Sequence, residues 1–277
     1  MPLELMFITN KPDVAKIAED SGVDRIWIDL EILGKVERQK GRNTVISNHS
    51  LEDIRKIKSI IKKSKLQVRV NPINSNSKIE IDTAIEYGAD ILMLPMFKTA
   101  DQVQYFIDLV DSRAKVLLLL ETKEAVENID EIISLVGIDE IHVGLNDLHL
   151  SYNKTFMFEL LIDGTLDFIA DKLKSKSMKF GFGGIARLNH GLVPAEYVIC
   201  HHYSIGSKMA ILSRSFCDAN YVNDPFEISQ LFLDGINRIR MVEKIYENYT
   251  ESQFQKNKNE LIEKINTVVE KIREKSK

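Results

Sequence analysis

Cysteine is scarce in this chain. Its 277 residues include only Cys200 and Cys217. Two cysteines are too few for a disulfide framework, and such low usage is typical of proteins in a reducing compartment. We therefore expect two small buried thiols in a cytoplasmic protein.

Long apolar runs and strong net charge are also absent. No stretch approaches the ~18 apolar residues that cross a bilayer, and the first ten residues lack the basic leader and apolar core of a signal peptide. The net charge is only −4, and neither half of the chain contains a dense basic block. These absences argue against a membrane or a nucleic acid as the main partner.

Short apolar runs alternate with amphipathic segments along most of the chain. This alternation indicates repeated βα units and a parallel sheet. Spacings of three and four residues predict helices, for example over 51–61 and 103–110. The expected strands lie near residues 3–8, 25–30, 66–71, 91–94, 116–120, 140–144, 179–182 and 207–212.

Eight alternations fit a (β/α)8 TIM barrel better than an open doubly wound sheet. An open sheet usually has fewer strands and a glycine-rich turn after the first one, and no such turn follows the first strand of this chain. We predict an α/β fold, with a barrel over residues 1–222 and C-terminal helices over 223–277.

The C-terminal segment contains no proline after residue 225. Its apolar residues Leu261, Ile265, Val268 and Ile272 follow a four-three-four spacing, which forms a seam on a charged helix. Such a seam needs a partner surface, either the chain's own barrel or a second subunit. We expect the second subunit, and therefore a homo-oligomer.

Two strand-like runs end in carboxylates. The apolar run 116–120 precedes Glu121, and the run that starts at His142 leads to Asp147. Buried charges need compensation, and neighbouring parallel strands would bring their ends about 5 Å apart. We therefore predict that Glu121 and Asp147 ligate one divalent cation.

Three more charged residues lie at predicted strand ends, where (β/α)8 barrels build their active sites. Asp29 and Glu31 close the second strand, and Arg69 lies near the end of the third. Strand alternation directs Arg69 into the barrel mouth. We expect Asp29 and Glu31 to hold metal-bound water or orient Arg69; an ordinary ion pair with Arg69 is the alternative.

An arginine that faces carboxylates and a hard cation suits a 2-oxo acid as ligand. The carboxylate and carbonyl oxygens of the ligand chelate the cation, while the guanidinium neutralises the charge that develops on the enolate oxygen. The turn formed by Gly144, Leu145 and Asn146 would add backbone N–H donors for the ligand carboxylate. This arrangement predicts carbon–carbon bond cleavage or formation through an enolate.

Five ordered segments carry a resemblance to a known family: VDRIWIDLE (23–31), VRVNP (68–72), GADILMLPM (88–96), ETKEAVEN (121–128) and IDEIHVGLNDL (138–148). The chain resembles the HpcH/HpaI aldolase and citrate lyase beta-subunit family of the phosphoenolpyruvate/pyruvate-binding barrels. The resemblance implies a Mg2+- or Mn2+-dependent lyase with Glu121 and Asp147 on the metal and Arg69 on the oxo acid. The family's swapped terminal helix and trimer-of-dimers assembly imply a trimer or hexamer.

The chain departs from the family pattern at two positions. Family aldolases carry a histidine base where this chain has Ile32, and Leu145 stands where the family often has proline. His49 either replaces that base or is an ordinary residue at a helix start. Citrate-lyase-like members lack the histidine, and their acyl-CoA substrates would suit the long basic segment 31–50, which contains Lys35, Arg38, Lys40 and Arg42; a solvated loop is the alternative.

Two other functions stay open. Gly183 and Gly184 follow the seventh predicted strand and resemble a phosphate-binding nest, which would fit a barrel isomerase or epimerase. Glycines there could equally serve close packing. The missing histidine also allows a non-catalytic barrel.

Overall fold

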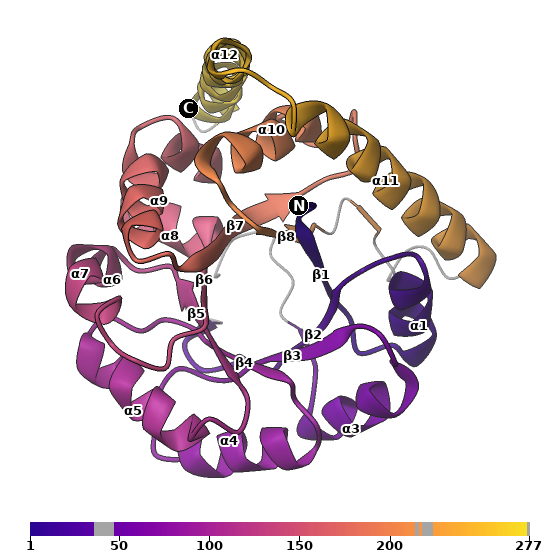
Figure 1. Cartoon of the computed structure of the whole chain (residues 1–277), viewed down its shortest axis with the longest axis vertical. Coiled ribbons are helices and arrows are strands. Elements are labelled where there is room, and N and C mark those ends of the chain that lie inside the picture. Colours follow the sequence, from indigo (N-terminus) through magenta and orange to yellow (C-terminus); the bar gives the residue numbers. More distant parts are fainter. Residues whose placement is uncertain (36–46, 214–215, 218–223, 276–277) are drawn as a thin grey trace. The chain divides into compact units, whose positions relative to one another are not determined.

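The structure is a computed structural model that describes residues 1–35, 47–213, 216–217 and 224–275. Eight strands follow one another in chain order around a closed barrel, and helices alternate with them (Figure 1). The predicted (β/α)8 TIM barrel with C-terminal helices is confirmed. The strands are β1 (Glu4–Ile8), β2 (Arg25–Asp29), β3 (Lys65–Arg69), β4 (Ile91–Leu94), β5 (Lys115–Leu120), β6 (Glu140–Val143), β7 (Lys179–Ile185) and β8 (Met209–Leu212).

The helices between the strands are mostly short, and two long helices follow β8. The former are α1 (Pro12–Asp20), α3 (Leu51–Ile60), α4 (Ser77–Glu86), α5 (Ala100–Val110), α6 (Lys123–Glu127), α7 (Ile129–Ile132), α8 (Leu145–Ser151), the 3-10 helix η1 (Met157–Leu161), α9 (Thr165–Ser175) and α10 (Ala195–Ile205). The latter are α11 (Pro225–Tyr246) and α12 (Glu251–Lys275). The helical spacings predicted over 51–61 and 103–110 correspond to α3 and α5.

The chain forms two compact units. Unit 1 contains Met1–Leu5 and His142–Lys277, and unit 2 contains Met6–Ile141. Helices α11 and α12 belong to unit 1 together with β7 and β8. The predicted division at residue 222 stays a prediction.

In unit 2 the strands are buried on both faces. Every residue of β2 and β4 is buried, and so are all five residues from Val116 to Leu120 in β5. Helices α1, α3, α4 and α5 lie outside these strands (Figure 1). Two-sided burial explains why the strands appear in the sequence as continuous apolar runs.

In unit 1, β7 extends to Ile185, three residues beyond its predicted end. Gly181 lies opposite Met209 and Gly184 opposite Ile211. Three steps along β7 therefore match two along β8, which defines a β-bulge. The glycines that the sequence places after the strand are part of the strand itself.

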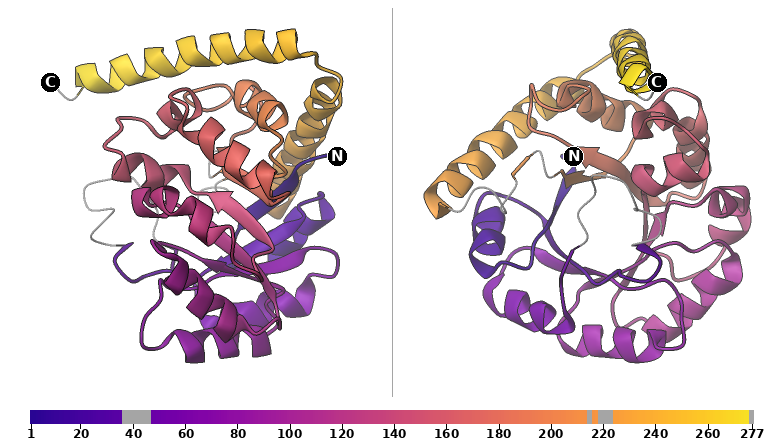
Figure 2. Two further views of the ribbon diagram at one scale, coloured as in Figure 1. Left: turned by 60° about the vertical axis from the view of Figure 1, so that its left-hand side comes forward. Right: turned by 180° about the vertical axis from the view of Figure 1, so that it is seen from behind.

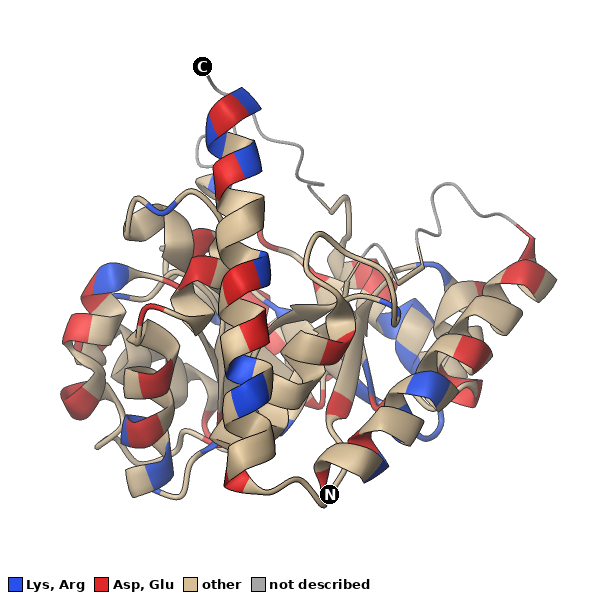
Figure 3. Ribbon diagram, turned by 90° about the horizontal axis from the view of Figure 1, so that it is seen from above, with Lys and Arg blue, Asp and Glu red and all other residues tan. Residues whose placement is uncertain are grey.

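Helix α12 packs on its own chain. Leu261 and Ile265 are fully buried, and Val268 and Val269 are buried beside them, whereas Ile272 is half-buried. The helix runs along α10 and contacts η1 (Figure 2), and Lys, Arg, Asp and Glu alternate along it (Figure 3). The seam is therefore covered by the same chain, and the homo-oligomer stays a prediction.

Two other sequence expectations can be compared with the structure. Cys200 and Cys217 are both free and buried, as expected. In the described part of the chain, no helix combines the length and the apolar character that crossing a membrane requires.

A buried ion pair joins the amino ends of β2 and β6 within unit 2. The Arg25 guanidinium donates to Glu140 Oε2 at 2.6 Å and to Oε1 at 2.9 Å. Both side chains are almost fully buried, and Gln67 Oε1 accepts a longer bond from Arg25. Each charge is tolerated in the interior because the other compensates it.

We expect Glu140→Gln to destabilise the protein by about 3–5 kcal/mol, because it leaves the Arg25 charge buried without its partner. Urea unfolding would measure the loss. Asp234→Asn is the matched control, since its pair with Arg238 is exposed and should change stability by less than about 0.5 kcal/mol. Equal losses in the two variants would contradict the assigned role of the buried pair.

Candidate active site

A cluster of four charged side chains lies at the carboxyl ends of β2 and β3: Asp29, Glu31, Lys35 and Arg69. The strand register places Asp29 opposite Arg69. Arg69 Nε and Nη2 donate to Asp29 Oδ1 and Oδ2, both at 2.8 Å, and Arg69 Nη1 lies 3.3 Å from Glu31 Oε2. The structure thus brings together three of the predicted site residues, and they form the ion pair that was one of the alternatives.

Lys35 also belongs to this cluster, although the sequence predicted for it only a place in a basic segment that binds an acyl-CoA or is solvated. Its Nζ donates to Asp29 Oδ2 at 2.7 Å and lies 3.7 Å from Glu31 Oε2. The side chain is only 4% exposed, so it is not a solvated loop lysine. The four-residue spacing from Glu31 was the available signal. The other basic residues of this segment, Arg38, Lys40 and Arg42, lie outside the described residues.

Asp29 accepts four hydrogen bonds. Its Oδ1 accepts from Arg69 Nε and from the Glu31 amide, and its Oδ2 accepts from Arg69 Nη2 and Lys35 Nζ. Burial by itself would raise the pKa of Asp29, but Arg69 and Lys35 outweigh it and hold the pKa well below its usual range. Asp29 is therefore a permanent anion that orients Arg69, and a carboxylate with four donors is a poor base.

Asn71, after β3, holds the segment that follows β2. Its Oδ1 accepts from the amides of Ile32 and Leu33, at 2.9 and 3.0 Å. Its Nδ2 donates to the Leu30 carbonyl at 3.1 Å and to Glu80 Oε1 at 2.7 Å. These bonds satisfy all four hydrogen-bonding positions of the amide. They fix the main chain on both sides of the second acidic residue of the cluster.

His49 contacts the cluster through its ring. Its Nδ1 accepts the Asp29 backbone N–H at 3.0 Å. Burial lowers the pKa of His49, although nearby carboxylates act in the opposite direction. In the neutral ring the only basic lone pair is therefore engaged by the main chain. This geometry favours a role in positioning the end of β2, and the catalytic role of His49 stays a prediction.

Glu121 follows β5 and is 3% exposed. Its Oε1 accepts the Met96 amide at 3.1 Å. Met96 has a φ of 56°, an uncommon value for a residue other than glycine. The next residue, Phe97, accepts at its carbonyl from the Thr122 hydroxyl at 2.8 Å. Two contacts from the segment after β4 thus position the predicted metal ligand, and the negative charge of Glu121 helps to raise the pKa of Arg69.

The other predicted ligands lie in unit 1, at the start of α8. Gly144 precedes the helix, Leu145 is buried, Asn146 is exposed, and Asp147 is half-buried in the first turn. The Leu145 side chain is buried beside Gly183, so Leu145 can contribute to a ligand site only through its main chain. Within the described residues, no three or more His, Cys, Asp or Glu side chains form a group that could hold a metal ion. That Asp147 shares one cation with Glu121 stays a prediction.

The glycines of β7 have a packing explanation. A Cβ on Gly183 would lie 2.6 Å from Leu145 Cδ1, and the residue has a φ of +46°. A Cβ on Gly181 would lie 2.4 Å from the Met209 carbonyl oxygen. Gly184 has only ordinary contacts, the nearest at 3.5 Å. Close packing accounts for Gly181 and Gly183 without a phosphate ligand.

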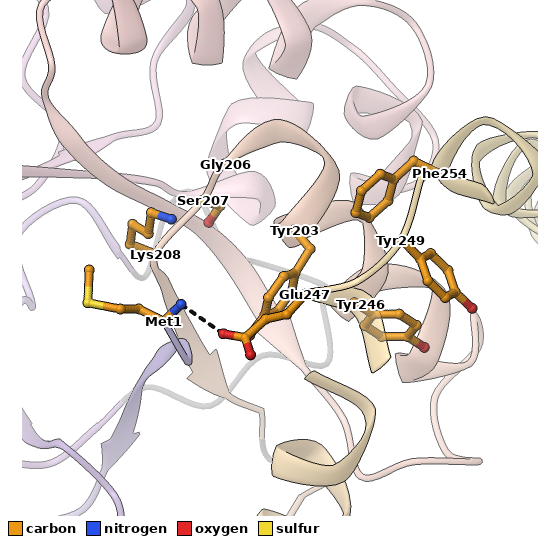
Figure 4. A pocket seen from close by; sticks show the side chains of 9 residues that line it. All are labelled: Met1, Tyr203, Gly206, Ser207, Lys208, Tyr246, Glu247, Tyr249 and Phe254. Atoms are coloured by element: carbon orange, nitrogen blue, oxygen red, sulfur yellow. Dashed lines mark hydrogen bonds and ion pairs between the residues drawn. The ribbon is translucent and has the colours of Figure 1, made fainter. Parts of the chain in front are cut away.

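A cavity of about 250 Å³ in unit 1 lies at the amino end of β8. Ser207 and Lys208, just before β8, line it together with Tyr203 and Tyr246 (Figure 4). The chain's first amino group lies 2.8 Å from Glu247 at its edge. Catalytic groups of (β/α)8 barrels lie at the carboxyl ends of strands, so this cavity is not the candidate active site.

Comparisons with known proteins give a family and a fold. The family model HpcH/HpaI aldolase/citrate lyase matches residues 4–156. Among curated proteins, none matches the chain in sequence.

Solved structures with low sequence identity share the fold. An HpcH/HpaI aldolase from Desulfitobacterium hafniense DCB-2 is 14% identical, with 86% of this chain and 93% of that chain covered and a TM-score of 0.59. An HpcH/HpaI aldolase/citrate lyase family protein from Burkholderia cenocepacia J2315 is 14% identical, with 87% and 95% covered and a TM-score of 0.61. The citrate synthase SbnG is 16% identical, with 79% and 90% covered and a TM-score of 0.60.

His49→Ala should destabilise the protein by about 1–3 kcal/mol, because the Asp29 amide loses its acceptor, whereas His49→Asn keeps an acceptor oxygen. The lowered pKa of His49 means that its neutral ring stabilises the fold above an ordinary pKa of ~6.5. This contribution is lost as the pH falls below that value. Urea unfolding at two pH values should therefore show a smaller difference between wild type and His49→Ala at about pH 5.5 than at about pH 7.5. Equal stability of the wild type and His49→Ala at both pH values would refute this role.

Proposed function

Because this chain belongs to the HpcH/HpaI aldolase/citrate lyase family, we propose that it is a divalent-cation-dependent carbon–carbon lyase or aldolase. The substrate is a small 2-oxo acid of the pyruvate or oxaloacetate type, or a related acyl compound, and the reaction proceeds through its enolate. The observation that carries the proposal is the fixed orientation of Arg69 at the end of β3. Asp29 and Glu31 pair with it, and the negative charge of Glu121 helps to raise its pKa.

Arg69 is the electrophilic stabiliser in this proposal. Its side chain is 12% exposed, so it is largely desolvated. Burial lowers its pKa, but Asp29, Glu31 and Glu121 raise it above its ordinary value. The guanidinium is therefore a permanent cation in a fixed orientation. A preorganised donor of this kind stabilises negative charge that develops on an enolate oxygen.

Glu121 and Asp147 are the proposed ligands of Mg2+ or Mn2+. Carboxylate oxygens are the hard donors that these ions prefer, and Glu121 is buried and oriented by the Met96 amide. When bound, the cation polarises the oxo and carboxylate oxygens of the substrate. The backbone amides of Gly144, Leu145 and Asn146 are the proposed donors to the substrate carboxylate.

Proton transfer is the remaining step. Asp29 accepts four hydrogen bonds, and the lone pair of His49 is engaged by a backbone amide. Both residues therefore suit positioning roles. Of the predicted catalytic groups, this leaves Glu31, whose Oε2 lies 3.3 Å from Arg69 Nη1. We assign the proton transfer to Glu31 and the charge stabilisation to Arg69.

The proposal also covers the cellular compartment, the assembly and the kind of partner. We propose a cytoplasmic homo-oligomer, a trimer or hexamer, that acts on small molecules.

Two alternative functions are compared with this proposal. A phosphate-binding isomerase is less well supported, because packing explains Gly181 and Gly183. A barrel without catalytic activity is a possible outcome of the next experiment.

Exchange of the pyruvate methyl protons in heavy water, followed by NMR, tests the enolate. We expect exchange with Mg2+ or Mn2+, and a loss of at least ~100-fold in Arg69→Lys, because a point charge cannot replace the bidentate, oriented donor. Arg55→Lys is the matched control, since Arg55 is an exposed arginine on α3. Absence of exchange by the wild type with every metal tried would favour the barrel without catalytic activity.

Mn2+ binding, followed by electron paramagnetic resonance, tests the ligand assignment. Glu121→Gln keeps an acceptor for the Met96 amide but removes the charge. We expect its Mn2+ affinity to fall by more than the ~10–100-fold typical of changes in residues that only support a ligand. Glu124→Gln, three residues later and half exposed, should leave affinity unchanged. An unaltered affinity in Glu121→Gln would reject the assignment.

A further inference from the structure

Two buried cations share the same two carboxylates at the end of β2. Asp29 accepts from Arg69 at 2.8 Å and from Lys35 at 2.7 Å. Glu31 Oε2 lies 3.3 Å from Arg69 and 3.7 Å from Lys35. Arg69 alone would suffice to form a bidentate pair with Asp29, so the second cation needs a reason of its own.

The position of Lys35 excludes direct contact with solvent-borne ligands. Its side chain is 4% exposed, against 12% for Arg69. Its ammonium group faces both carboxylates, so its donors are directed into the cluster. Lys35 therefore acts on a ligand through the other members of the cluster, and it is a positioning residue.

The charges in the cluster explain what Lys35 contributes. Asp29 and Glu31 carry two negative charges, and Arg69 and Lys35 carry two positive charges, so the four groups are together neutral. Removal of the Lys35 charge leaves the same two carboxylates beside Arg69 and makes the cluster more negative by one unit. In a buried site such a charge repels anions and attracts cations strongly, because the effective dielectric constant is lower than in water.

We propose that Lys35 sets the relative affinity of this site for anions and for cations. It neutralises the acidic pair at the end of β2, so that the positive charge of Arg69 remains available to the carboxylate or enolate oxygen of a 2-oxo acid. This inference rests on the proposed function. It adds a residue whose removal has opposite effects on the two kinds of ligand.

The experiment measures Mn2+ alone by electron paramagnetic resonance, and then oxalate at saturating Mn2+ by calorimetry. Lys35→Met keeps the length of the side chain and removes its charge. We expect it to bind Mn2+ several-fold more tightly and oxalate about tenfold more weakly, by the loss of one neighbouring positive charge. Lys35→Arg, which keeps the charge, should not show the opposite shifts of the two affinities that we expect in Lys35→Met.

Two further variants complete the test. Glu31→Gln in the Lys35→Met background removes one negative charge and so restores the original charge of the cluster. It should return both affinities towards the wild-type values even where Lys35→Met alone folds poorly. Lys58→Met removes a lysine that pairs with Asp90 outside the cluster, and it should change neither affinity.

The outcomes separate the two proposals. If the wild type binds neither Mn2+ nor oxalate, the proposed function fails and this inference fails with it. If the wild type binds both, parallel loss of both affinities in Lys35→Met shows a merely structural lysine and overturns the inference alone. Unchanged affinities in that variant also overturn it, and opposite shifts reversed by Glu31→Gln support it.

Discussion

The bidentate pair between Asp29 and Arg69 is the contact on which the candidate site depends. It exists because β2 and β3 pair in parallel, with these two residues opposite one another at the strand ends. A slip of one residue would turn each side chain to the other face of its strand. Lys35 donates to a carboxylate oxygen of Asp29, and the His49 ring accepts from the Asp29 backbone amide. The orientation of Arg69, and with it the proposed chemistry, follows from strand register.

Strand β2 carries buried charge at both ends, and the two ends differ in accessibility. Arg25, at the amino end, forms a bidentate pair with Glu140 in which both side chains are at most 3% exposed. Asp29, on the same face four residues later, pairs with an arginine that is 12% exposed. A sealed pair can only stabilise the fold, whereas a pair with a partly accessible cation can also meet a ligand. The carboxyl end of β2 is therefore the end at which the candidate site is accessible to a ligand, which is where (β/α)8 barrels build their active sites.

The two departures from the family pattern are accommodated locally. Ile32 stands where family aldolases have histidine; its side chain is 58% exposed, and its amide is bound by Asn71. Leu145, where proline is frequent, packs against the position that a Cβ of Gly183 would occupy. Neither change disturbs the fold, which is shared with solved structures at 14–16% identity. The fold therefore tolerates both departures.

The sequence by itself determined the barrel and the residues at its strand ends, because apolar periodicity and the alternation of side chains along a strand are local properties. Asp29, Arg69 and Glu121 could be placed from these patterns alone. Tertiary structure decided which donors share a carboxylate: the burial of Lys35 and the engagement of the His49 ring both depend on contacts between separate segments. The bulge in β7 likewise depends on how its glycines fit against β8. A linear pattern cannot determine such contacts, because each is set by the three-dimensional position of its partner.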